Sequence, residues 1–237
     1  MTSMFEDCVA FNPSTFSNWD ISKVQSLKHT FKNCPAFDSS VDGWDLSSVT
    51  SLEGAFNMDR DYTPVFNRDL SAWDTSSVHT LSRAFHATDA FEGLGIDSWD
   101  VSSVTDMYAA FIHTPVLGHG DLSGWDISQV TNFQYTFAYS TGSGLGTEGW
   151  DVSAGIIFAN MFGGNREMDV DLNAWYVYVR QSVPILHSIY ICINLVLCHF
   201  DVMYVRLHVL GMSRVELTLV LCFQTAAPLC CRLALGI

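Results

Sequence analysis

Apolar positions recur along the first 175 residues in a unit of 25 to 29 residues, and each unit carries one tryptophan. An apolar residue precedes this Trp by three positions and others follow it by two, five, eight and twelve, as in Leu122, Trp125, Ile127, Val130, Phe133 and Phe137. The tryptophans are Trp19, Trp44, Trp73, Trp99, Trp125, Trp150 and Trp175. So regular a spacing predicts a tandem repeat.

Each unit contains two local patterns. In its first half, apolar residues at i, i+3 and i+5 have the L-x-x-L-x-L spacing of a leucine-rich strand, with Trp in one leucine position. In its second half, Val104, Met107 and Phe111 have the i, i+3, i+7 spacing of one helical stripe, with Ser102 or Ser103 as the N-cap. The closing Phe positions are Phe31, Phe56, Phe85, Phe111, Phe137 and Phe162. We therefore predict one short strand and one short helix per repeat.

One such unit cannot fold alone, because the backbone entropy lost on ordering it exceeds what burying a single Trp returns. Stacked units cover one another's apolar stripes. The pattern therefore predicts an α/β repeat solenoid, a leucine-rich-repeat-like right-handed coil with about seven units in residues 1–175.

The tryptophan is followed by Asp and then by Ser two places on in six units. The strings FNRDLSAWDTSSVHTLSRAF (66–85), WDVSSVTDMYAAF (99–111) and WDISQVTNFQYTF (125–137) resemble the repeats of BspA-like leucine-rich-repeat surface proteins. The resemblance covers residues 4–175, with departures at the longer lead-in around 59–63 and at AGIIF (154–158). It implies a solenoid on a surface or secreted protein that serves adhesion or binding, with no common enzymatic activity.

The repeated Asp would form a row in a stack, at Asp20, Asp45, Asp74, Asp100, Asp126 and Asp151. Such a row could bind Ca²⁺, which prefers oxygen ligands. Alternatively, each Asp accepts a backbone N–H in an Asx turn. We favour the turn, and we expect these positions, like the Trp and Phe positions, to be structural.

Cys8 and Cys34 occupy the same position of successive units. Coils spaced by about 4.8 Å, the distance between neighbouring strands, would bring the pair within disulfide reach. Two buried thiols acting as small core residues are the alternative that we favour.

Nothing in the sequence forms a catalytic, metal-binding or cofactor-binding motif. The repeat histidines lack ligand spacing, and no P-loop, G-x-S-x-G or C-x-x-C is present. A formal charge of −14 also disfavours nucleic acid as a partner. The sequence therefore predicts neither an enzyme nor a cofactor.

The chain changes character near Trp175. Residues 1–175 hold 23 acidic and 7 basic side chains, a net charge of −16, whereas residues 176–237 hold 2 and 4, a net charge of +2. We expect two parts, the repeat region and a non-repeat apolar tail. We interpret the tail as translation beyond a misread gene boundary, because the codons of Trp175, Tyr176 and Val177 must contain GTAYGT, close to a splice donor. A capping segment and a membrane-associated hairpin are the alternatives, and membrane contact is expected only if the tail is genuine.

The start of the chain falls in mid-repeat and shows no signal-peptide pattern. We expect it to belong to a longer protein, because solenoid ends need polar caps. The residues do not fix a compartment, whereas the family resemblance suggests the cell surface or secretion.

The expected function is a non-catalytic surface binding or adhesion module for an unspecified protein or glycan, and the alternative is a structural spacer. A binding face would show varied, often aromatic, exposed residues. The positions that we expect to be exposed are small and uniform: Ser71, Ala72, Asp97, Ser98, Ser123 and Gly124.

Overall fold

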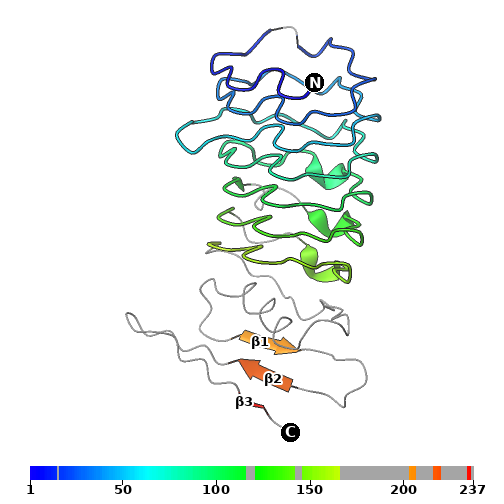
Figure 1. Ribbon diagram of the computed structural model, residues 1–237, viewed down its shortest axis with the longest axis vertical. Helices are drawn as coiled ribbons and strands as arrows, with labels where there is room; N and C mark the ends of the chain where they lie inside the picture. Colours follow the sequence, from blue (N-terminus) through cyan, green and yellow to red (C-terminus); the bar gives the residue numbers. More distant parts are fainter. Residues whose placement is uncertain are drawn as a thin grey trace.

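The computed structural model describes residues 1–14, 16–115, 121–141 and 146–165, together with the backbone of three short strands nearer the C-terminus. Within residues 1–165 the chain winds through successive coils that stack along the long axis of the molecule (Figure 1). Each coil carries one repeat, and five isolated parallel bridges join neighbouring coils within these residues. The bridges pair Ser26 with Ser51, Ser51 with Thr80, Thr80 with Asp106, Asp106 with Asn132, and Asn132 with Ile157.

These bridges lie seven residues after each Trp, in the half of the repeat where we expected a helix. Here every second N–H donates to the next coil, as His29 donates to the carbonyl of Glu53 (2.8 Å) and Phe31 to that of Ala55 (2.8 Å). The N–H groups in between close turns within the coil, as Thr30 donates to Leu27 (3.0 Å). An α-helix would use all of these N–H groups internally, and none is found in the described residues.

The turns of this half place non-glycine residues in the left-handed region. His29 and Asn33 have φ of 53° and 56°, and the residues ten and fourteen positions after Trp73, Trp99 and Trp125 have φ between 51° and 57°. The i, i+3, i+7 apolar spacing suits this ribbon of turns as well as it suits a helix. The spacing therefore located the buried side chains correctly but not the backbone that carries them.

The half before each Trp, where we expected a strand, is a single 3₁₀ turn in three repeats. These turns are η1 (Ile96–Ser98), η3 (Leu122–Gly124) and η4 (Thr147–Gly149). The N–H of the following Trp closes each one by donating to the first residue of the turn. All six positions expected from the sequence to be exposed are exposed: Asp97, Ser98, Ser123 and Gly124 lie in these 3₁₀ turns, and Ser71 and Ala72 lie in the corresponding turn of the third repeat.

The core is a continuous stack of aromatic rings. Trp44 and the next four tryptophans are at most 4% exposed, whereas Trp19 in the first coil is 39% exposed. Trp73 stacks on Trp99 (centroids 6.0 Å apart), and Trp125 stacks on Trp150 (6.3 Å). The closing Phe residues, all buried, form a second column with centroids 5.2 to 5.8 Å apart: Phe31, Phe56, Phe85, Phe111, Phe137 and Phe162. Trp175 lies outside the described residues.

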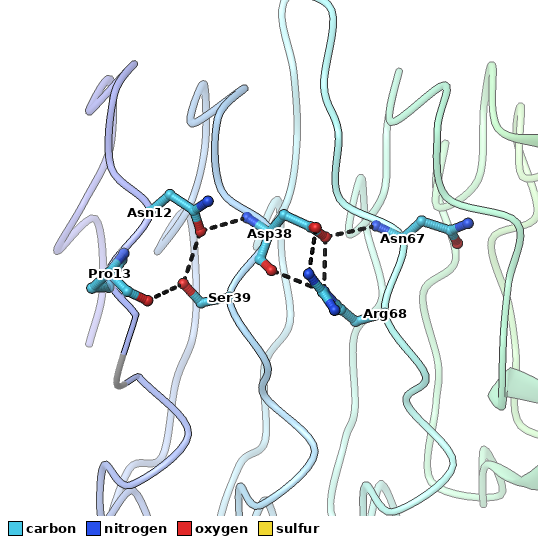
Figure 2. A network of polar contacts seen from close by, with 6 residues as sticks. All are labelled: Asn12, Pro13, Asp38, Ser39, Asn67 and Arg68. Atoms are coloured by element: carbon cyan, nitrogen blue, oxygen red, sulfur yellow. Dashed lines mark hydrogen bonds and ion pairs between the residues drawn. The ribbon is translucent and has the colours of Figure 1, made fainter.

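A polar ladder fixes neighbouring coils on another side of the stack (Figure 2). The side chain of Asn12 accepts the N–H of Asp38 (3.0 Å), and Asp38 in turn accepts the N–H of Asn67 (3.4 Å). Asn67 continues the ladder by accepting the N–H of Glu92 (3.1 Å). Arg68 adds an ion pair with the Asp38 carboxylate. All of these residues except Arg68 directly follow the Phe of the F-N-x-D motif, which explains why a hydrogen-bond acceptor recurs there.

Of the tail, the structure describes an antiparallel sheet in the order β1-β2-β3. The strands are β1 (Met203–Arg206), β2 (Glu216–Leu219) and β3 (Ala234–Leu235). Met203 is opposite Leu219, and Leu217 is opposite Leu235. The rest of residues 176–237 lies outside the described part, so our interpretation of the tail stays a prediction. No helix in the described ranges is long and apolar enough to span a membrane.

Candidate functional site

The Asp that follows each Trp makes a local turn in every coil. One carboxylate oxygen accepts the N–H of the residue two places on, at 2.9 to 3.1 Å, for Asp20, Asp45, Asp74, Asp100, Asp126 and Asp151. The hydrogen bonds from the Ser hydroxyl and N–H lower the pKa of Asp20, Asp45, Asp100 and Asp151. This is the Asx-turn geometry that we favoured over a Ca²⁺ row. No group of three or more possible metal ligands is found in the described ranges.

Cys8 and Cys34 are both free, but only Cys34 is buried, so the expectation of two buried thiols is wrong for the exposed Cys8. The Sγ of Cys34 donates to the carbonyl oxygen of Phe5 in the preceding coil (2.8 Å), and burial raises the pKa of the Cys34 thiol to about 11. In three later coils the same position holds a polar side chain that also donates to the Phe carbonyl of the preceding coil: Thr88 to Phe56, Ser140 to Phe111 and Asn165 to Phe137. Cys34 is therefore a hydrogen-bonding residue of the coil contact, a role that its small size alone did not suggest.

A group of exposed and half-buried aromatic and basic side chains lies nine to fourteen residues after Trp in three successive coils. We call this group the aromatic patch, and it consists of Arg83, His86, Tyr108, His113, Tyr135 and Tyr139. The Arg83 guanidinium carbon lies 4.9 Å from the centroid of the Tyr108 ring, and Tyr108 meets Tyr135 edge-on at 6.4 Å. His113 stacks on Tyr139 at 4.6 Å. Contacts between neighbouring coils therefore hold these rings in place.

The basic groups of the patch influence one another. Burial lowers the pKa of the His86 imidazole and the charges of Arg83 and Arg60 lower it further, while a hydrogen bond to the Met58 carbonyl opposes them. Burial and then the charge of Arg60 lower the pKa of His113, against the effect of Asp89. Arg60 belongs to the longer lead-in of the third repeat, so this insertion contributes to the electrostatics of both histidines. Both imidazoles are accordingly biased toward the neutral form.

The sequence did not single out this patch. Tyr108 occupies the position that carries Lys28, Glu53 or Gln134 in other coils, and the positions of the other patch residues vary in the same way, so no period marks them. The only signal in the sequence was that the residue type varies between coils at these positions. The predicted helix would have placed them on one solvent-exposed face. The exposed positions that the sequence did single out lie before Trp and carry small side chains.

A family model described as "Mycoplasma protein of unknown function, DUF285" matches residues 1–112 and again residues 79–184. No curated protein and no solved structure matches the chain. Since the two family matches span well over half of the sequence, the chain belongs to the family DUF285.

Proposed function

We propose that the chain is a non-catalytic binding or adhesion module, a BspA-like, leucine-rich-repeat-like solenoid that presents the aromatic patch to a protein or glycan. Membership of DUF285 supports the repeat assignment, because BspA-like repeat proteins belong to that family. Surface or secreted localisation is part of the same proposal and follows from the family resemblance.

The observation that carries the proposal is the variation of partly exposed side chains at equivalent positions. Nine residues after Trp the successive coils hold Lys28, Glu53, Ser82, Tyr108 and Gln134. A spacer needs only a uniform solvated surface there. Tyr, Arg and His side chains that are already ordered by neighbours lose little entropy on binding, which is why Tyr and Arg dominate contact hot spots.

The structural spacer remains the alternative, and one observation favours it. The face formed by the turns before Trp, at Ser71, Ala72, Ser98 and Ser123, is exposed and uniform. Such a face offers no anchor to a partner. The two functions can coexist on different sides of one stack, but they predict different consequences for mutations in the patch.

Arrays of proteins and glycans probed with the full chain would test the binding function. The double variant Tyr108→Ala/Tyr135→Ala is expected to lose ligands that the unmodified chain captures. The control Ser71→Ala/Ser98→Ala changes the uniform face and is expected to retain them, and melting curves would verify that both variants fold. Capture of no ligand would support the spacer instead, and equal capture by the patch variant would overturn the aromatic patch as the binding surface.

A further inference from the structure

The first coil, at one end of the stack, presents a row of backbone carbonyl groups without donors (Figure 1). Within the stack, three carbonyls of each coil accept N–H groups from the coil before it. Between two central coils the pairs are Arg83 with Tyr108, Phe85 with Ala110, and Ala87 with Ile112, at 2.8 to 2.9 Å. The equivalent carbonyls of the first coil belong to Thr2, Met4 and Glu6, and none of them accepts a hydrogen bond from a described residue.

Side chains at this end are exposed where their equivalents are buried. Met4 is 52% exposed, whereas its equivalents in later coils are at most 1% exposed: Thr30, Ala55, Ala84, Ala110, Thr136 and Met161. Trp19 is 39% exposed, and its indole N–H lacks, within the described ranges, the carbonyl acceptor that the later tryptophans find in the preceding coil. Phe5 stacks on Phe31 (5.7 Å) but is only half-buried. The contact that buries the later positions is therefore open here.

The polarity of the backbone groups determines what can cover this end. A second copy that met it face to face would bring one row of acceptors against another and would leave both rows without donors. A covering segment must instead supply N–H groups from alternate residues and one carbonyl for the Trp19 indole. Residues 79–99 do this for the coil that follows them, because three of their N–H groups donate to it and the Ile96 carbonyl accepts the Trp125 indole (2.9 Å).

We propose that this end of the first coil binds a peptide segment of another chain that has the apolar and polar pattern of the repeat. Docking continues the contact between coils, as a strand is added to the edge of a sheet, so backbone hydrogen bonds supply affinity. An aromatic side chain of the segment stacks on Phe5, as Phe85 stacks on Phe111 (5.7 Å). Met161 shows that a Met side chain fits this contact, because it is fully buried at the position equivalent to Met4. The surface is separate from the aromatic patch, so the inference goes beyond the function proposed for that patch.

The test is fluorescence anisotropy of a labelled peptide of residues 79–99 titrated with the full chain. Saturable but weak binding is expected, because the peptide must become ordered as it docks. A peptide of the same composition in scrambled order is expected not to bind. N-methylation of Phe85 in the peptide removes one N–H donor and is expected to weaken binding about three- to tenfold.

Variants of the full chain locate the site. Met4→Asp is expected to weaken binding about tenfold or more, because docking would bury a carboxylate without a partner. Met4→Ala installs the residue of three later coils and is expected to retain binding. Val65→Asp is the matched control, since Val65 is also 52% exposed but belongs to the third repeat, and it is expected to leave the affinity unchanged.

Equal affinity of Met4→Asp and the unmodified chain, with both folded by their melting curves, would overturn the site. Absence of saturable binding up to about 1 mM peptide would overturn the proposed partner class. A dimer in analytical ultracentrifugation that Met4→Asp dissociates, without peptide binding, would assign this end to a second copy instead. The patch variant Tyr108→Ala/Tyr135→Ala is expected to bind the peptide like the unmodified chain, so the two proposals fail independently.

Discussion

The indole Nε1 of Trp125 donates a hydrogen bond to the carbonyl oxygen of Ile96, which lies 2.9 Å away in the preceding coil. Ile96 is three residues before Trp99, and each buried Trp finds its acceptor at the same position of the coil before it. The other pairs are Trp44 with Phe16, Trp73 with Val41, Trp99 with Leu70 and Trp150 with Leu122. This bond explains why Trp, and not another large apolar residue, occupies the position.

Two substitutions of Trp125 separate the contribution of its buried ring to stability from that of its hydrogen bond. Trp125→Ala is expected to lower the free energy of unfolding by about 3–5 kcal/mol, because it removes a buried ring. Trp125→Phe retains most of the apolar contact and is expected to cost about 0.5–1.5 kcal/mol for the lost hydrogen bond, because the Ile96 carbonyl keeps the N–H of Trp99 as its other donor.

Urea melts of the two variants would measure both losses. Trp19→Phe is the control, because Trp19 is 39% exposed and makes no such bond within the described ranges, so its loss should be smaller. A cost below about 1 kcal/mol for Trp125→Ala would place the ring in solvent, against the measured range for core truncations.

The sequence predicted which side chains are buried, but not how the backbone presents them. The spacing of Val104, Met107 and Phe111 fixes a buried stripe, and all three are buried. Periodicity does not reveal where the N–H groups go, and here every second one bonds to another coil. Contacts between residues about 26 positions apart decide that choice. The aromatic patch was not predicted for the same reason, because its residues come together only when neighbouring coils stack.

Substitutions of Cys34 would test the hydrogen bond that its thiol donates to the preceding coil. If its thiol serves as a donor to the Phe5 carbonyl, Cys34→Ser should be more stable than Cys34→Ala by about 0.5–1.5 kcal/mol, because the hydroxyl keeps the bond. If Cys34 only fills space, the order reverses, since a buried hydroxyl without a partner is costly. Chemical unfolding under reducing conditions would give the order. Cys8→Ser is the control at the exposed equivalent position and should change stability little.

We expect the row of Asp residues not to bind calcium. Each Asp already holds a backbone N–H, so millimolar Ca²⁺ should leave the melting temperature of the chain unchanged. A ligand that binds only the folded state must raise that temperature. Calorimetry with and without the ion would show it, and a rise abolished by Asp100→Asn together with Asp126→Asn would contradict the Asx-turn assignment.

Gly95 marks a close approach between coils. Its φ is +81°, and an added Cβ would lie 2.2 Å from the Ser71 backbone nitrogen and 2.6 Å from the Asp69 carboxylate. Gly95→Ala is therefore expected to cost about 2–4 kcal/mol in unfolding free energy, from overpacking and left-handed strain together. Gly124→Ala is the matched control, since an added Cβ there meets nothing within 4 Å, and a change within about 0.5 kcal/mol is expected. Equal unfolding free energies for the two variants would show that the coils move apart at Gly95 at little cost.

His86 should make stability depend on pH in the mildly acidic range. Burial and the charges of Arg83 and Arg60 lower its pKa below the ordinary value of 6.5, against the Met58 carbonyl that favours the protonated ring. As pH falls through about 6.5 the unfolded chain takes up a proton that the folded chain resists, so stability is lost toward lower pH. His113, whose pKa is lowered by burial and Arg60 and raised by Asp89, adds to this trend. Unfolding free energies at pH 7 and pH 5 are expected to differ less in His86→Gln than in the unmodified chain.

The exposed His79 is the control, because His79→Gln should leave the difference between the two pH values as it was. An unchanged difference in His86→Gln would show that the His86 ring is protonated as easily in the folded chain as in the unfolded one.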